Sequence, residues 1–190
     1  ILFRFIFPPT DTRYCINSVA LEFVPFENIS NTEEIILAAG CFWGVEYHFG
    51  KLNGVLKTEV GYTGGFVDDP SYEQVCNSNT SHVEAIRIIY NPKIIDYRYI
   101  IQFFFEIHDF QQEDGQGGDI GYQYLSNIFY YSEVQKTLAS AIIHQLQDMG
   151  YKVVTELKPV TTFWKAEDYH QKYYNKNVQL PYCHSWKKKF

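Results

Sequence analysis

The sequence predicts an α/β (α+β) two-layer sandwich with a ferredoxin-like split βαβ core, extra helices and a C-terminal tail. Its apolar patterns follow the order strand, helix, strand, strand, helix, strand, which is the order of that core. With 190 residues and 46% hydrophobic content, the chain is long enough for one domain with a full core. We expect an N-terminal extension over residues 1–32, the main domain over 33–178 and the tail over 179–190.

The first strand and the first helix of the domain meet at a cysteine. The apolar run Ile35–Ala39 predicts a buried strand, and Phe42–Phe49 carries apolar residues at helical intervals. Between them lie Gly40 and Cys41. The free N–H groups and the positive dipole end of a helix favour a thiolate at its first turn. Cys41 is therefore a candidate nucleophile, and the alternative is a buried, inert cysteine.

The remaining elements follow from similar patterns. Polar and glycine-rich segments separate them, and the longest, Asp109–Gly121, is expected to be a functional loop. The predicted strands are Val55–Tyr62, His82–Tyr90, Tyr124–Tyr131 and Lys152–Pro159; the predicted helical segments are Ser71–Cys76, Tyr97–Ile107 with Asp96 as cap, one from Ser132 to Gly150, and Ala166–Asn177.

One carboxyl is expected on the apolar face of a strand. The two-residue period of the strand at 82–90 places Glu84 on one face with Ile86 and Ile88. Desolvation there would raise the pKa of Glu84 and keep it protonated near neutral pH, so that it could donate a hydrogen bond. The alternative is an ion pair at the sheet edge, although Arg87 points to the opposite face.

Composition excludes several classes of function. The net charge is −6 and the basic residues are scattered, so no nucleic-acid surface is expected, and Lys187–Lys189 are expected to be a solvated end. The apolar start, Ile1–Phe7, is too short to span a membrane. Because the chain does not begin with Met, we leave open a targeting segment that the sequence lacks.

The cysteines suggest a reducing compartment rather than a secreted scaffold. The chain has four of them, widely dispersed, without a Cys-x-x-Cys pair. No His and Cys spacing fits a zinc site, so neither a metal nor another cofactor is expected. We therefore expect a cytoplasmic protein with sulfur-based chemistry. Cys76 is expected to pack in the core and Cys15 to belong to the extension.

Other candidates carry weaker signals. Tyr72, Asp119 and Tyr124 lie in or beside loops, where a purely structural role is the alternative for each. Cys183 lies in a segment with Pro181 and no regular period, which favours a mobile arm whose thiol could meet a distant oxidised sulfur. An incidental exposed cysteine is the alternative. Several histidines could act as a base, but no motif ties any of them to Cys41: His82, His108, His144, His170 and His184.

Blocks along residues 33–184 together resemble the A-class peptide methionine sulfoxide reductases. The resemblance begins with Gly40-Cys41-Phe42-Trp43-Gly44, which is similar to the active-site signature of that family. The further blocks, in the same order as in the family, are Val60–Gly65, Tyr72–Cys76, His82–Ala85, Gly118–Gly121 with Gln123-Tyr124, and Ala166–Gln171.

The resemblance implies a role for each candidate. Cys41 would attack the sulfoxide sulfur, and Phe42 and Trp43 would form the pocket for its methyl group. The sulfoxide oxygen would be bound by Tyr72, Tyr124 and a protonated Glu84, with Asp119 steadying the site. Cys183 would be the resolving cysteine, which forms a disulfide with Cys41.

The resemblance also implies substrates and partners. The substrates would be methionine S-sulfoxide, free and within proteins after oxidation, and thioredoxin would reduce the disulfide. We expect a monomer that needs no nucleic acid, membrane or cofactor. Two competing hypotheses are a cysteine-dependent acyltransferase or hydrolase, and a non-catalytic peptide-binding module.

Overall fold

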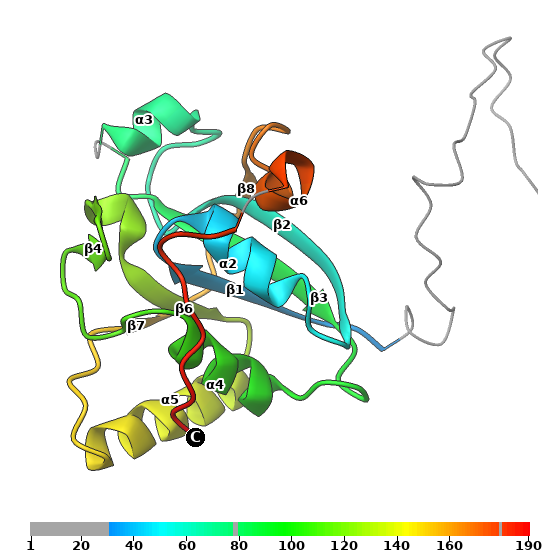
Figure 1. The fold of residues 1–190 in the computed structure, drawn as a ribbon, viewed down its shortest axis with the longest axis vertical. Coiled ribbons are helices and arrows are strands. Elements are labelled where there is room, and N and C mark those ends of the chain that lie inside the picture. Colours follow the sequence, from blue (N-terminus) through cyan, green and yellow to red (C-terminus); the bar gives the residue numbers. More distant parts are fainter. Residues whose placement is uncertain (1–30, 78–79, 179) are drawn as a thin grey trace, which may run out of the picture.

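The computed structural model describes residues 31–77, 80–178 and 180–190. The predicted extension lies outside the described residues except for its last two, and Cys15 lies outside them as well. The described elements, in chain order, are β1 Glu33–Ala39, α2 Phe42–Phe49, β2 Val55–Thr63, α3 Tyr72–Cys76, β3 Val83–Tyr90, α4 Tyr97–Ile107, β4 Gly115–Gln116, β5 Asp119–Ile120, the 3₁₀ turn η2 Tyr122–Tyr124, β6 Ser126–Tyr130, α5 Glu133–Asp148, β7 Glu156–Pro159, β8 Trp164–Lys165 and α6 Tyr173–Asn177 (Figure 1).

The main sheet confirms the predicted split βαβ core. Its strand order is β7-β6-β1-β3-β2-β8. Strands β1 and β2 both run antiparallel to β3, which lies between them, so β1 and β2 are parallel to each other and joined through α2. Strand β6 pairs antiparallel with the other side of β1. This places the end of β1, and with it Cys41, at the centre of the sheet.

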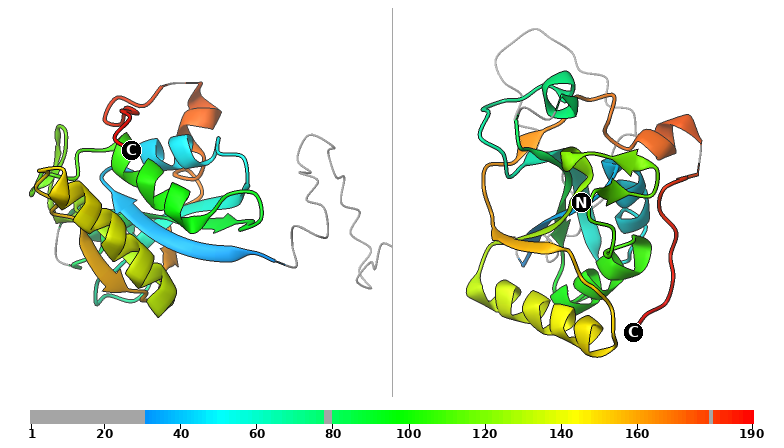
Figure 2. Two further views of the ribbon diagram at one scale, coloured as in Figure 1. Left: turned by 90° about the horizontal axis from the view of Figure 1, so that it is seen from below. Right: turned by 90° about the vertical axis from the view of Figure 1, so that its left-hand side faces the viewer.

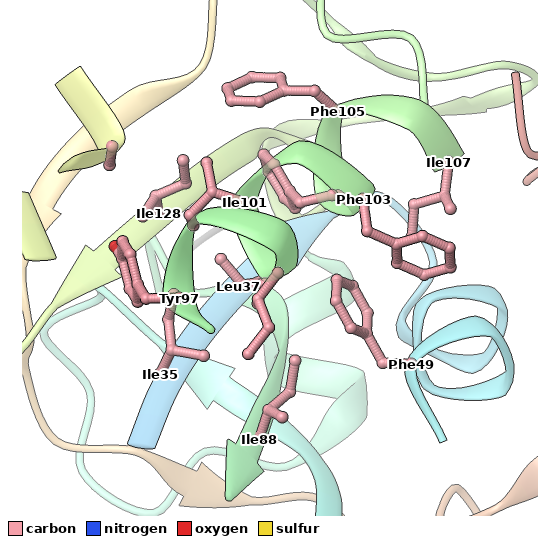
Figure 3. Packing of buried hydrophobic residues seen from close by; sticks show 14 of the residues in the cluster. Ile35, Leu37, Phe49, Ile88, Tyr97, Ile101, Phe103, Phe105, Ile107 and Ile128 are labelled. Carbon is pink, nitrogen blue, oxygen red and sulfur yellow. The ribbon is translucent and has the colours of Figure 1, made fainter. Parts of the chain in front are cut away.

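The helices lie on one face of this sheet and form the second layer. Figure 3 shows side chains of β1 and β3, including Ile35, Leu37 and Ile88, packed against Phe49 of α2 and Ile101 of α4. Helix α5 contributes to the same cluster, and Figure 2 shows it flanking α4. Burying each of these side chains contributes about 1.5–3 kcal/mol, so this layer fixes the first turn of α2 against the sheet.

The C-terminal part of the domain departs from two predictions. The helix predicted over Ala166–Asn177 is wrong for residues 166–172; only Tyr173–Asn177 is helical. The earlier residues bond to the edge of β2 instead: the N–H of Ala166 donates to the carbonyl of Val60, and the Gln171 side chain bonds both the N–H and the carbonyl of Val60. The strand predicted over Lys152–Pro159 forms only over Glu156–Pro159.

The end of the chain is packed on the domain rather than solvated. It crosses over α2 and ends beside α4 (Figure 1). The N–H of Lys187 donates to the carbonyl of Glu106, and the Lys189 ammonium donates to the carbonyls of Phe105 and His108. The prediction of a solvated lysine end is therefore wrong for Lys189, whose cation binds carbonyls at the C-terminal end of α4.

None of the described helices combines the length and the apolar character that a membrane span requires.

Candidate active site

Cys41 is the N-cap residue of α2, as predicted. The turn before it depends on Gly40, which has a φ of +86°. A Cβ on Gly40 would lie 2.3 Å from the Cβ of Gln116, so only glycine allows this close approach. The thiol is 7% exposed. Position and burial together place a sulfur at the mouth of a helix, under the 115–120 hairpin.

The sulfur of Cys41 lies in a cluster with Cys183 and Asp119. Their two sulfurs and one carboxylate oxygen all lie within 4.8 Å of one another. A hydrogen bond with Cys183, followed by burial, raises the pKa of the Cys41 thiol well above its usual range. The expectation of a resting thiolate is therefore wrong for this arrangement, because these two effects outweigh the backbone N–H of Trp43, which lowers the pKa.

The sequence spacing also failed to reveal this cluster as a set of ligands. Two thiols and a carboxylate within reach of one ion could hold a metal, although no His and Cys spacing in the sequence suggests a zinc site. The expectation that the protein needs no metal stays a prediction.

Glu84 is almost completely buried, with 1% exposure. Its Oε2 accepts the N–H of Phe42 at 3.0 Å, which places the carboxyl at the first turn of α2. Burial, and then the charge of Cys41, raises the pKa of Glu84 well above its usual range. Arg87 pairs instead with Glu34 and Glu59, with N–O distances of 3.1 and 3.6 Å. The desolvated, protonated carboxyl is therefore the alternative that the structure supports.

Phe42 and Trp43 form an aromatic wall beside Cys41. Phe42 is buried, and its ring centroid lies 5.9 Å from that of Tyr62. Trp43 stacks on Tyr173, with centroids 3.7 Å apart and planes at 6°. Its indole N–H donates to Nδ1 of His170 at 3.0 Å. These contacts hold the half-buried indole in one orientation.

The two predicted phenols lie near the buried carboxyl. Tyr72 begins α3 and Tyr124 ends η2, and both side chains are half-buried. Burial, followed by the charge of Glu84, raises the pKa of both, in Tyr124 to about 12. Both phenols therefore keep their protons and can donate hydrogen bonds. Cys76 lies next to Tyr72 and is half-buried, not a core residue as expected.

Asp119 lies on β5, opposite the C-terminal segment. Its carboxylate accepts the phenol O–H of Tyr182, at 3.0 Å to Oδ1 and 3.2 Å to Oδ2. This bond holds the segment next to Cys183, and the Gln116 amide donates to the Cys183 carbonyl at 3.1 Å. The predicted mobile arm is thus docked in the structure, with its thiol beside Cys41.

The residue after the predicted resolving cysteine is also part of the site. The Nδ1 of His184 lies 3.0 Å from the sulfur of Cys183, and its Nε2 lies 2.6 Å from the carbonyl of Ala39. His184 was one of several histidines without a tie to Cys41 in the sequence. Its tie is through Cys183, which the path of the tail creates.

Three further residues support the aromatic wall and were not singled out. Glu167 accepts the phenol O–H of Tyr62 and the N–H of Tyr72. His170 receives the Trp43 indole, and Gln171 holds the segment against β2. All three fall in the block Ala166–Gln171 of the resemblance, so that block was the available signal.

The comparisons with known proteins agree with this geometry. Residues 33–190 match the family model described as peptide methionine sulfoxide reductase. A relative from Methanosarcina acetivorans, named peptide methionine sulfoxide reductase MsrA, is 46% identical over 155 residues, which are 80% of this chain and 82% of the relative.

Two solved structures of Mxr1 from Saccharomyces cerevisiae are similar as well. The reduced form is 34% identical with a TM-score of 0.78, covering 89% of this chain and 97% of that one. The complex with Trx2 is 25% identical with a TM-score of 0.56, covering 89% and 96%.

These likenesses span nearly the whole described domain and include the cluster around Cys41. They do not favour an acyltransferase, a hydrolase or a simple binding module. The chain belongs to the peptide methionine sulfoxide reductase family and is an oxidoreductase that reduces methionine sulfoxide.

Proposed function

We propose that this enzyme reduces the S epimer of methionine sulfoxide, free and within proteins, through a sulfenic acid on Cys41 and a Cys41–Cys183 disulfide. The observation that carries the proposal is the grouping of three features around one sulfur: the buried carboxyl of Glu84, the aromatic wall and a second thiol. A sulfoxide needs each of them, since its oxygen must be protonated, its methyl group is apolar and its oxygen atom must finally leave the enzyme.

The substrate would bind with its methyl group against Phe42 and Trp43 and its oxygen toward Glu84. Aromatic faces suit a methyl group bonded to sulfur. The protonated Glu84 and the phenols of Tyr72 and Tyr124 would donate hydrogen bonds to the sulfoxide oxygen. A neutral donor set suits this substrate, because the sulfoxide carries no net charge.

The first step transfers the oxygen from the substrate to Cys41. The Cys41 sulfur attacks the sulfoxide sulfur, and the substrate oxygen passes to Cys41, so that thiol and sulfoxide become sulfenic acid and thioether. Because the resting Cys41 thiol is protonated, its ionisation must accompany substrate binding. Displacement of the Cys183 thiol by the substrate would remove the largest cause of its raised pKa.

The second step releases water. The Cys183 sulfur attacks the Cys41 sulfur, an S–S bond forms, and the hydroxyl leaves with a proton as water. The two cysteine sulfurs lie within 4.8 Å of each other, so a small movement brings them to the bond length of about 2 Å. The half-buried Cys183 lines a cavity of about 250 Å³, which supports access of a reductant to its sulfur.

A thioredoxin-type dithiol would reduce this disulfide. The structure of yeast Mxr1 in complex with Trx2 supports such a partner. We place the enzyme, acting as a monomer, in a reducing compartment such as the cytoplasm, where dithiols are regenerated.

The test supplies racemic methionine sulfoxide and a dithiol reductant. The wild type should consume half of the substrate and stop, while Cys41→Ser should show no activity. After one turnover without reductant, mass spectrometry should find a Cys41–Cys183 disulfide. Full activity of Cys41→Ser would refute the proposed nucleophile, and a persistent sulfenic acid on Cys41 would refute Cys183 as its resolver.

A further inference from the structure

The contacts of His184 fix which ring nitrogen carries a proton. Its Nε2 lies 2.6 Å from the carbonyl oxygen of Ala39, and a carbonyl only accepts hydrogen bonds. Nε2 therefore carries the proton and donates it to Ala39. In the neutral ring, Nδ1 is left with a free lone pair, which points at the sulfur of Cys183 at 3.0 Å. The thiol of Cys183 thus donates to a nitrogen that can accept its proton.

The fold provides space for this ring at one position only. A Cβ on Gly44 would lie 2.2 Å from Nδ1 of His184, so the glycine in the first turn of α2 lets the imidazole lie directly against the helix. The ring is 5% exposed, and burial lowers its pKa, which keeps it neutral at neutral pH. The Gly44 of the active-site motif therefore admits the histidine that faces Cys183.

We propose that His184 is the base that takes the proton of the Cys183 thiol when Cys183 attacks the sulfenic acid of Cys41. This inference rests on the Cys41–Cys183 disulfide of the proposed function. The proton moves from the Cys183 sulfur to Nδ1 of His184, the S–S bond forms as the S–O bond of Cys41 breaks, and the imidazolium returns the proton to the leaving hydroxide. Thiol and sulfenic acid give disulfide and water, and His184 ends neutral.

A base is needed because a thiol with an ordinary pKa is mostly protonated at neutral pH, and only the thiolate attacks efficiently. A positioned base contributes about 10²–10⁴-fold to such a proton transfer. The other titratable groups around His184 are Cys41 and His48 on the side of α2, His108 at the end of α4 and Asp119 on β5. Of these, Asp119 opposes the effect of burial on the pKa of His184.

The experiment compares the wild type with His184→Gln in single turnovers without reductant. Glutamine can still donate to the carbonyl of Ala39 but offers no base to Cys183. Two steps are timed: the release of one equivalent of methionine, and the formation of the disulfide, followed by quenching and mass spectrometry with dimedone to trap the sulfenic acid. His144→Gln, on the exposed face of α5, is the matched control.

We expect His184→Gln to release methionine at close to the wild-type rate, to accumulate the Cys41 sulfenic acid and to form the disulfide about 10²-fold more slowly. Its disulfide rate should rise about tenfold per pH unit, because attack then depends on free thiolate. The wild-type rate should instead level off between about pH 5 and pH 8, once His184 is neutral.

Disulfide formation in His184→Gln at the wild-type rate and with the wild-type pH profile would overturn the role of His184 and leave the proposed function intact. If the wild type itself released no methionine, the proposed function would fail. If His184→Gln released none, the wild-type profile decides: a plateau supports the base, and a tenfold rise per pH unit throughout the range overturns it.

Discussion

Glu84 combines a structural bond with a chemical one in the same carboxyl. One oxygen accepts the N–H of Phe42, which ties β3 to the first turn of α2. The protonated carboxyl then has an O–H to offer to the substrate oxygen. Because burial is the first cause of its raised pKa, the same packing that closes the core also keeps this acid uncharged.

Replacing Glu84 by Gln should therefore separate the two bonds. Glutamine keeps an oxygen that accepts the Phe42 N–H and donates a hydrogen bond, but it cannot deliver a proton. We expect kcat/KM to fall about 10²–10⁴-fold, with the thermal midpoint little changed. In the wild type, activity should decline as the pH rises through the raised pKa of Glu84, and this decline should be absent from Glu84→Gln. A variant with full activity would contradict the acid role.

At this scale the sequence predicted the residues that local rules or motifs mark and missed those that the tail brings in. Cys41 follows from a strand-to-helix turn, and Glu84 from the two-residue period of β3. Tyr182 and His184 reach their partners across sequence separations of 63 and 145 residues. No local pattern encodes such contacts, since they depend on the path of the chain after α6.

At the scale of elements, α4 serves as the dock for the C-terminal segment. Glu106, near the end of α4, accepts the indole N–H of Trp186 at 2.9 Å and the N–H of Lys189 at 2.9 Å through its two carboxylate oxygens. Its backbone carbonyl accepts the N–H of Lys187. The segment that carries Cys183 is thus held at both ends, by Asp119 before the thiol and by Glu106 after it.

Loss of the Glu106 carboxylate should loosen this dock. We expect Glu106→Ala to slow formation of the Cys41–Cys183 disulfide about tenfold, because hydrogen bonds to a charged group contribute about 1.5–3 kcal/mol each. Release of the first equivalent of methionine should stay at the wild-type rate. Glu113→Ala, which removes a surface partner of Lys152, is the control. If disulfide formation is as fast in Glu106→Ala as in that control, the dock does not position Cys183.

The elements also show where pattern rules stop. Ranges such as Tyr97–Ile107, with Asp96 as its cap, were predicted to the residue because apolar spacing and capping agree. The helix predicted over Ala166–Asn177 failed because the side chain of Gln171 and the backbone of Ala166 satisfy the exposed edge of β2. An edge that needs partners is a property of the sheet, and the segment's own sequence does not reveal it.

At the scale of the whole molecule, the strand order could be predicted because the βαβ rules leave few alternatives. The balance of buried charge could not. Burial lowers the pKa of four histidines, His48, His108, His170 and His184, while it raises the pKa of Glu84. The two groups act in opposite directions on stability, so the net dependence on pH belongs to the complete fold.

The histidines make the fold sensitive to acid. A buried histidine with a lowered pKa stays neutral in the folded state while the unfolded chain binds a proton below about pH 6.5. Its stabilising contribution is complete above that pH and is lost as the pH falls toward the folded pKa. For His108, which donates to the carbonyl of Phe104 and accepts from Ser126, the folded pKa is lowered to about 3.

We therefore expect the urea midpoint of the wild type to be lower at about pH 5 than at about pH 7.5. His108→Asn should be less stable than the wild type at both values, because packing is lost, but its midpoint should fall less between them. Exposed His144, replaced by Asn, should leave the difference unchanged. Glu84 works against this trend, since its raised pKa makes the fold less stable as the pH increases above about 4.5, and it does so equally in all three proteins. The change in slope caused by His108→Asn thus isolates the histidine, and an unchanged slope would show that His108 is not the neutral buried base of the core.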